Sequence, residues 1–114
     1  MKQEIEIRLE KHGDITIFDI QGDVTVFSEP FFNKAYKSAN DQGLSKIILK
    51  FYENAYINSG GIAVLIQLLA ETKKNNQLIS ITGLSPHFQK IFNMVGISKF
   101  ARIYSTPEEA LANM

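Results

Sequence analysis

Cysteine is absent from the 114-residue sequence, and neither sign of charge is in excess. Without cysteine the chain has no disulfides, thiolate metal sites or cysteine nucleophiles, a pattern compatible with a reducing compartment. Twelve Lys and Arg residues balance twelve Asp and Glu residues. The summed field therefore has no sign that would attract nucleic acid or an anionic membrane surface, and neither is expected as a partner.

Long apolar runs are also missing. The longest, Ile62 to Ile66, is far too short to span a bilayer, and the polar start Met1-Lys2-Gln3-Glu4 does not resemble a secretory signal. We therefore expect no membrane insertion and a cytoplasmic location. What is present is an ordinary globular composition, 45% hydrophobic and 21% charged, sufficient for one core in one domain spanning residues 1–114.

The first part of the chain reads as a β-hairpin. Residues 5–9 alternate apolar and charged side chains, and residues 15–20 again place isoleucines with alternating spacing. A period of two is typical of strands with one wet face. His12-Gly13-Asp14 supplies turn residues between the two runs, so an antiparallel pair is predicted.

A helix and a buried strand are predicted next. Ser28 is placed as the N-cap, Pro30 lies in the first turn, and Gly43 is positioned to end the helix. Residues 46–51 follow with an unbroken apolar centre, which suits a strand buried on both faces.

The second half continues this alternation. Residues 60–74 form a helix whose apolar side chains point in too many directions for a surface helix, so a central position is predicted. A short strand is predicted at 78–81, then a helix capped by Ser85 and closed by Gly96, and residues 106–109 form a capping box that opens the last helix. The pattern predicts one α/β domain, a mixed sheet with an N-terminal hairpin followed by βα units and about four helices.

A polar turn separates the buried strand from the central helix. Asn58 and Ser59 are both good N-cap residues, and Gly60 with Gly61 leaves backbone N–H groups uncovered by side chains. In parallel α/β units, ligands and switches collect at such turns. Considered without any relative, capping alone is the more ordinary interpretation of Asn58 and Ser59.

The stretch Asn58-Ser59-Gly60-Gly61-Ile62-Ala63-Val64-Leu65 resembles the Asp-Ser-(Ser/Thr)-Gly-Leu-Gly-Val-Leu signature of STAS-domain anti-sigma factor antagonists. Three further segments are similar to that family at matching spacing: Gly22-Asp23-Val24, the Ser-Pro helix from Leu84 to Ile97, and the last helix from Thr106 to Leu111. The resemblance covers nearly the whole chain and implies a STAS fold.

The resemblance also implies a partner-switching cycle. The unmodified protein binds an anti-sigma factor, often a serine kinase, and phosphorylation of the serine after the motif Asp abolishes that binding until a phosphatase removes the group. By position the acceptor is Ser59. Asn58, Gly60, Gly61, Ile62 and Met94 are the expected switch-loop and partner-binding residues, with no cofactor and no catalysis.

Two departures keep a second function open. Asn58 stands where the family's phosphorylatable members have Asp, and Gly60 replaces the usual second Ser or Thr. Both favour a STAS adaptor that is not phosphorylated, such as the cytoplasmic subunit of a lipid-transport ATPase complex or a signalling scaffold. A third possibility is small-anion binding at the turn, which the lack of Lys or Arg in residues 51–72 disfavours.

Other residues carry weaker signals. His12 and His87 are isolated and offer no metal-ligand spacing, and the Gly-x-Ser-x-Gly elbow of a hydrolase is absent. One face of a helix does not usually bury three aromatic side chains within so short a segment as the one that holds Phe27, Phe31 and Phe32. This suggests a hydrophobic interaction patch. The sequence leaves the oligomeric state undetermined.

Overall fold

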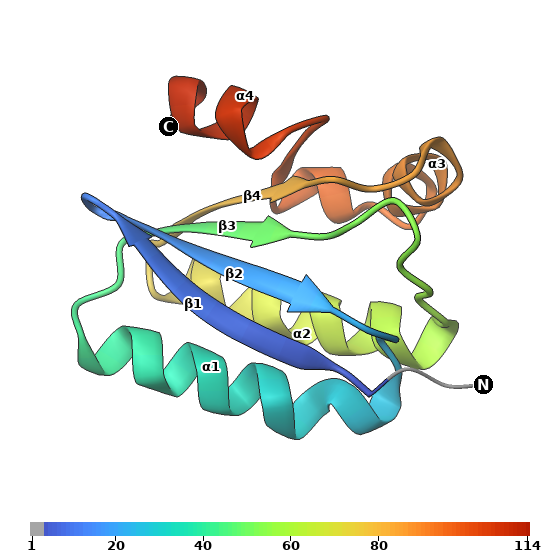
Figure 1. The fold of residues 1–114 in the computed structure, drawn as a ribbon, viewed down its shortest axis with the longest axis horizontal. Coiled ribbons are helices and arrows are strands. Elements are labelled where there is room, and N and C mark those ends of the chain that lie inside the picture. The colour runs from blue at the N-terminus through green and yellow to red at the C-terminus, as the bar shows by residue number, and fades with distance from the viewer. Residues whose placement is uncertain (1–3) are drawn as a thin grey trace.

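A five-stranded mixed sheet forms the centre of the molecule (Figure 1). The structure, a computed structural model, describes residues 4–114. The strands lie side by side in chain order: β1 (Glu6–His12), β2 (Ile15–Gln21), β3 (Lys46–Lys50), β4 (Leu78–Thr82) and β5 (Arg102–Tyr104). β1 is antiparallel to β2 and every other neighbouring pair is parallel, which confirms the hairpin and the mixed sheet.

Helices connect the parallel strands and cover both faces of the sheet. They are α1 (Glu29–Asp41), α2 (Ser59–Lys74), α3 (Pro86–Met94) and α4 (Pro107–Asn113), with short 3-10 turns η1 (Val26–Ser28) and η2 (Ile97–Lys99). α1, α2 and α3 join successive parallel strands and pack on one face, because same-handed crossovers place their helices on the same side. α4 covers the other face (Figure 1).

Two hydrophobic cores hold these layers together. The larger lies between the sheet and α1–α3 and includes the fully buried Phe18, Leu49, Leu65 and Phe92. The smaller lies under α4 around Ile48, on the opposite face of β3. β3 is therefore buried on both faces, as its unbroken apolar centre predicts. No helix within residues 4–114 is long and apolar enough to cross a lipid bilayer.

One prediction about these elements is wrong, and one strand was not predicted. α2 does not occupy a central position surrounded by protein, since Ala63, Gln67 and Ala70 form an exposed stripe. Two of these outward positions, Ala63 and Ala70, are small apolar residues, which made the helix look apolar in nearly every direction. β5 was not predicted, because three residues are too few to show a period. It joins the sheet through pairing with β4.

The start of α1 also differs from the prediction. Ser28 occupies the N-cap position, but its side chain makes no cap hydrogen bond to α1. Its hydroxyl instead accepts a hydrogen bond from the N–H of Thr25 at 2.9 Å and donates to the carbonyl of Asp23 at 3.3 Å. The bond from Thr25 is one half of a capping box around η1, in which the side chain of Thr25 also accepts a backbone N–H, and this box fixes the loop that enters α1.

Candidate functional site: the paired loops at the start of α2

Ser59 is the first residue of α2 and its side chain is exposed. The preceding residue, Asn58, is extended and caps the helix, because its Oδ1 accepts a hydrogen bond from the N–H of Gly61 at 2.9 Å. The carbonyl of Asn58 accepts the N–H of Ile62 at 2.9 Å. Asn58 therefore does the capping, and no group within residues 4–114 hydrogen-bonds to the hydroxyl of Ser59.

A second loop, between β2 and α1, is joined to this turn. Val24 and Ile57 form an isolated parallel bridge. The N–H of Val24 donates to the carbonyl of Tyr56 at 2.8 Å, and the N–H of Asn58 donates to the carbonyl of Val24 at 3.2 Å. The two loops therefore extend the β2–β3 pairing beyond the strands and hold each other in place.

Glycine is required where α2 passes the second loop. A Cβ on Gly61 would lie 2.1 Å from the carbonyl oxygen of Val24, well inside van der Waals contact. A Cβ on Gly60 would lie 3.1 Å from both the Cβ and the backbone N of Val26, a tight contact that a shift of a few tenths of an ångström would relieve. The first turn of α2 is thus pressed against η1, with Ser59 facing outward.

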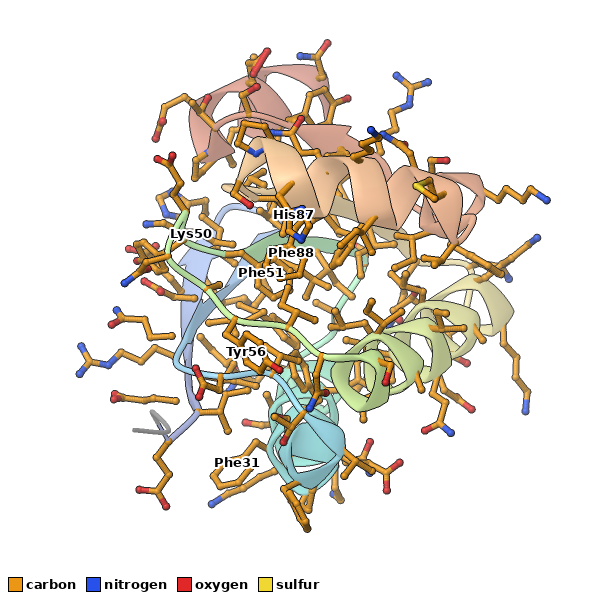
Figure 2. All side chains as sticks on the ribbon, turned by 90° about the vertical axis from the view of Figure 1, so that its right-hand side faces the viewer. Phe31, Lys50, Phe51, Tyr56, His87 and Phe88 are labelled. Carbon is orange, nitrogen blue, oxygen red and sulfur yellow. The ribbon has the colours of Figure 1, made fainter. Side chains whose placement is uncertain are left out.

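Three apolar side chains on these loops are exposed to solvent. The exposed fractions are 57% for Val26, 77% for Phe27 and 55% for Tyr56. Figure 2 looks onto this end of the molecule and shows Tyr56 on the loop that leads into α2. We call Val26, Phe27, Tyr56, Asn58 and Ser59 the switch surface. It combines a free hydroxyl with apolar side chains that a partner could cover.

The switch surface carries little positive charge of its own. Residues 51–72 contain no Lys or Arg, and residues 22–28 contain only one charged side chain, that of Asp23. A phosphoryl group on Ser59 would meet the N-terminal end of α2 and its macrodipole but no basic side chain from these segments. The site is therefore poorly suited to tight binding of a free phosphate or nucleotide.

Comparison with known proteins places this geometry in a family. A family model for the STAS domain matches residues 6–110. This chain belongs to the STAS domain family. Three solved structures share its fold: an anti-sigma factor antagonist from Mycobacterium paratuberculosis (15% identity, TM-score 0.80, covering 96% of this chain and 93% of that one); the anti-sigma factor antagonist SpoIIAA in its unphosphorylated form (18%, 0.73, 95% and 95%); and SpoIIAA of Bacillus in its phosphorylated form (19%, 0.69, 95% and 98%).

The residues expected at the site from the STAS motif fall into two groups, those that are exposed and those that support the exposed ones. Ser59 is exposed and Asn58 partly so, whereas Gly61 is buried against Val24 and Gly60 lies under Val26. Ile62 is partly buried and packs on the main core. The glycines and Ile62 therefore position the first turn of α2, while Asn58 and Ser59 are the residues of this turn that face solvent.

Met94 lies on α3 and not on the paired loops that carry the other expected site residues. It ends α3 and is 76% exposed. The turn that follows it reaches Phe100, whose ring lies 5.5 Å from the ammonium of Lys73 near the C-terminal end of α2. Lys73 is about 21 Å along the helix from Ser59 at 1.5 Å per residue. Phe100, six residues after Met94, therefore lies near the end of α2 that is opposite Ser59.

Val26 and Tyr56 were missed by sequence reasoning. Val26 lies beyond the Gly22-Asp23-Val24 motif, and Tyr56 lies before the Asn58-Ser59 motif, so neither was singled out as a site residue. The one sequence feature that could have indicated them is the polar turn nearby, because residues that flank such a turn lie on loops. Only the pairing of the two loops shows that they flank Ser59.

The histidines lie elsewhere. Nε2 of His12, at the hairpin end, is 3.5 Å from a carboxylate oxygen of Glu10, and the ring of His87 packs edge-on against Phe88 in the first turn of α3. Within residues 4–114 no group of three acidic or histidine side chains is placed to hold a metal ion.

Proposed function

We propose that this STAS protein is an anti-sigma factor antagonist that binds an anti-sigma factor of the serine kinase type through the switch surface. Phosphorylation of Ser59 by that kinase ends the complex, and a phosphatase restores the binding form. The protein itself catalyses no reaction in this cycle. The observation that carries the proposal is the exposed hydroxyl of Ser59, held at the start of α2 among exposed Val26, Phe27 and Tyr56.

The energetics favour a switch of affinity over a switch of fold. A phosphate at a helix N-terminus is stabilised by about 1 kcal/mol, up to about 2 kcal/mol when partly buried. Burial of the same charge without a partner in an interface costs several times more, about 3–5 kcal/mol by analogy with broken buried ion pairs. Because the interface effect is larger, phosphorylation of Ser59 should release the partner and leave the domain folded.

Phosphorylation can be tested with the kinase itself. The chain is used to capture its anti-sigma kinase from native lysate, and the purified kinase is then incubated with the chain and ATP. Wild type should gain one phosphoryl group by intact mass, and Ser59→Ala should gain none. Ser38→Ala, which removes another exposed helical serine, is the matched control and should be labelled like wild type. Labelling that persists in Ser59→Ala rejects the site.

A specific observation also supports a second function. The side chain of Asn58 is uncharged and caps α2 through its Oδ1. The carboxylate that the family's phosphorylatable members have at this position is therefore missing beside Ser59. This favours an adaptor that binds without being phosphorylated, for instance in a lipid-transport ATPase complex. Co-purification with a transport ATPase, with no phosphate gained from any captured kinase, would select this function over the first.

A further inference from the structure

The free edge of the sheet at β1 carries a pattern of charges that complements itself. On one face of β1, Glu6, Arg8 and Glu10 alternate in sign, and His12 follows at the end of the strand. All of these residues are exposed. Charges on an edge strand usually prevent pairing with other chains. Charges of alternating sign prevent pairing only in some registers. In other registers, two antiparallel copies of the strand place opposite charges opposite each other.

The backbone of β1 is oriented for such pairing. His12 lies opposite Ile15 across a two-residue turn, and the pair that flanks such a turn exchanges both of its hydrogen bonds. Hydrogen-bonded pairs alternate along the ladder, so the even-numbered residues of β1 bond to β2. The N–H and C=O groups of Ile7, Leu9 and Lys11 therefore point to the free edge.

We infer that β1 pairs with β1 of a second copy of this chain, antiparallel and centred on Leu9, to form one continuous ten-stranded sheet. Leu9 is the midpoint of Glu6–His12, so this register pairs the whole strand. It places Arg8 opposite Glu10 of the second copy twice, by symmetry. This inference concerns assembly and does not depend on the proposed function.

The alternative registers are less favourable. Centring the pair on Arg8 would oppose the two arginines and set Glu6 against Glu10, and centring it on Glu10 would oppose two glutamates. Like charges directly opposite each other destabilise a strand pair. Centring on Ile7 does pair Glu6 with Arg8, but it leaves the C-terminal part of β1 unpaired and opposes Glu4 with Glu10. The charges thus select the register centred on Leu9.

The apolar face of the edge supports the same arrangement. Ile7 and Leu9 line a groove of about 320 Å³ between β1 and α1, together with Phe31 and the stem of Lys34. Leu9 is 36% exposed and Phe31 is 43% exposed. In the inferred dimer Leu9 meets Leu9 of the second copy at the two-fold axis, beside this groove. One strand pair buries less than the extensive interface of an obligate dimer, so a reversible, concentration-dependent dimer is expected.

Sedimentation equilibrium from micromolar to millimolar concentration tests the dimer. The weight-average mass of wild type should rise from 12.9 kDa toward twice that value. Arg8→Glu and Glu10→Arg each place like charges opposite one another at two positions, so each should raise the dissociation constant about tenfold or more. The double variant Arg8→Glu/Glu10→Arg exchanges the charges and should restore dimerisation.

The register is tested by cross-linking. The chain has no cysteine, so a single introduced thiol has no competitor. Leu9→Cys places two thiols opposite each other, at a Cα separation of about 5.5 Å that a disulfide accommodates. Ile7→Cys faces Lys11 and is the control. Mild oxidation should give a covalent dimer for Leu9→Cys alone. A mass that stays at 12.9 kDa at every concentration, a double variant that stays monomeric, or cross-linking through position 7 in place of 9 overturns the inference.

Discussion

The carbonyl oxygen of Val24 occupies the space that a side chain at position 61 would need, since a Cβ on Gly61 would lie 2.1 Å from it. Through this contact the first turn of α2 rests on the loop between β2 and α1. The same carbonyl accepts the N–H of Asn58. One peptide group therefore sets the position of the cap, the helix and the exposed Ser59.

Gly61→Ala should destabilise the domain. The added methyl group forces the two loops apart, and overpacking of this kind costs about 1–3 kcal/mol. Gly60→Ala is the matched control, because its methyl group meets the Cβ and backbone N of Val26 at 3.1 Å, a tight contact that a small shift relieves, and alanine favours the helix by about 1 kcal/mol. Urea denaturation measures both free energies of unfolding. Equal values for the two variants would show that the Val24 contact does not constrain position 61.

Substitutions of Asn58 separate its capping role from its missing charge. Asn58→Ala removes the acceptor for the N–H of Gly61 and should lower the free energy of unfolding by about 1 kcal/mol. Asn58→Asp keeps the acceptor and adds a negative charge at the helix N-terminus, which should raise stability by about 0.3–1 kcal/mol at neutral pH. Thermal denaturation in low salt checks the order Asp, Asn, Ala. Under the proposed function, Asn58→Asp should also be phosphorylated faster than wild type, as measured by the initial rate with the captured kinase.

Phe27→Ala should affect binding and not folding. Its ring is 77% exposed, so its loss should change the free energy of unfolding by no more than about 0.5 kcal/mol. If the switch surface contacts the partner, the same change should weaken binding by about 2 kcal/mol, the scale of an aromatic hot spot. Phe32→Ala gives the opposite outcome. That ring is fully buried, and its loss should cost about 3–5 kcal/mol of stability. Unchanged affinity in Phe27→Ala would remove Phe27 from the interface.

Two buried threonines should respond differently to replacement by valine. Both are fully buried, but Thr72 donates a hydrogen bond to the carbonyl of Leu69 at 2.7 Å, whereas the hydroxyl of Thr82 has no partner among residues 4–114. Thr72→Val should therefore lose about 1 kcal/mol of stability, and Thr82→Val should gain about 1 kcal/mol. Denaturant titration of the pair is the measurement. A loss in Thr82→Val would mean that its hydroxyl is satisfied in solution.

Local patterns in the sequence account for most of the fold. The hairpin follows from alternation, and the helix boundaries at Asn58, Ser85, Gly96 and Thr106 follow from capping chemistry that acts within a few residues. β5 was beyond this reasoning, because a three-residue strand is defined by pairing with β4 and not by its own periodicity. The exposed stripe of α2 was hidden by its alanines.

The candidate site was predictable only in part. The turn motif identifies Asn58 and Ser59 from the sequence alone. The bridge between Val24 and Ile57 is long-range, and no local pattern indicates that Val26 would lie against Gly60. The position of Met94 likewise depends on how α3 packs. Contacts between residues far apart in the chain decide which residues share a surface.

The affinity of the chain for its captured kinase, measured by calorimetry before and after incubation with ATP, tests the proposed switch most directly. Wild type should bind before incubation and lose most of its affinity afterwards, with its circular dichroism spectrum unchanged. Ser59→Ala should bind at both stages. Binding of wild type that survives full phosphorylation, or loss of binding in Ser59→Ala after ATP, would contradict a switch based on the hydroxyl at the start of α2.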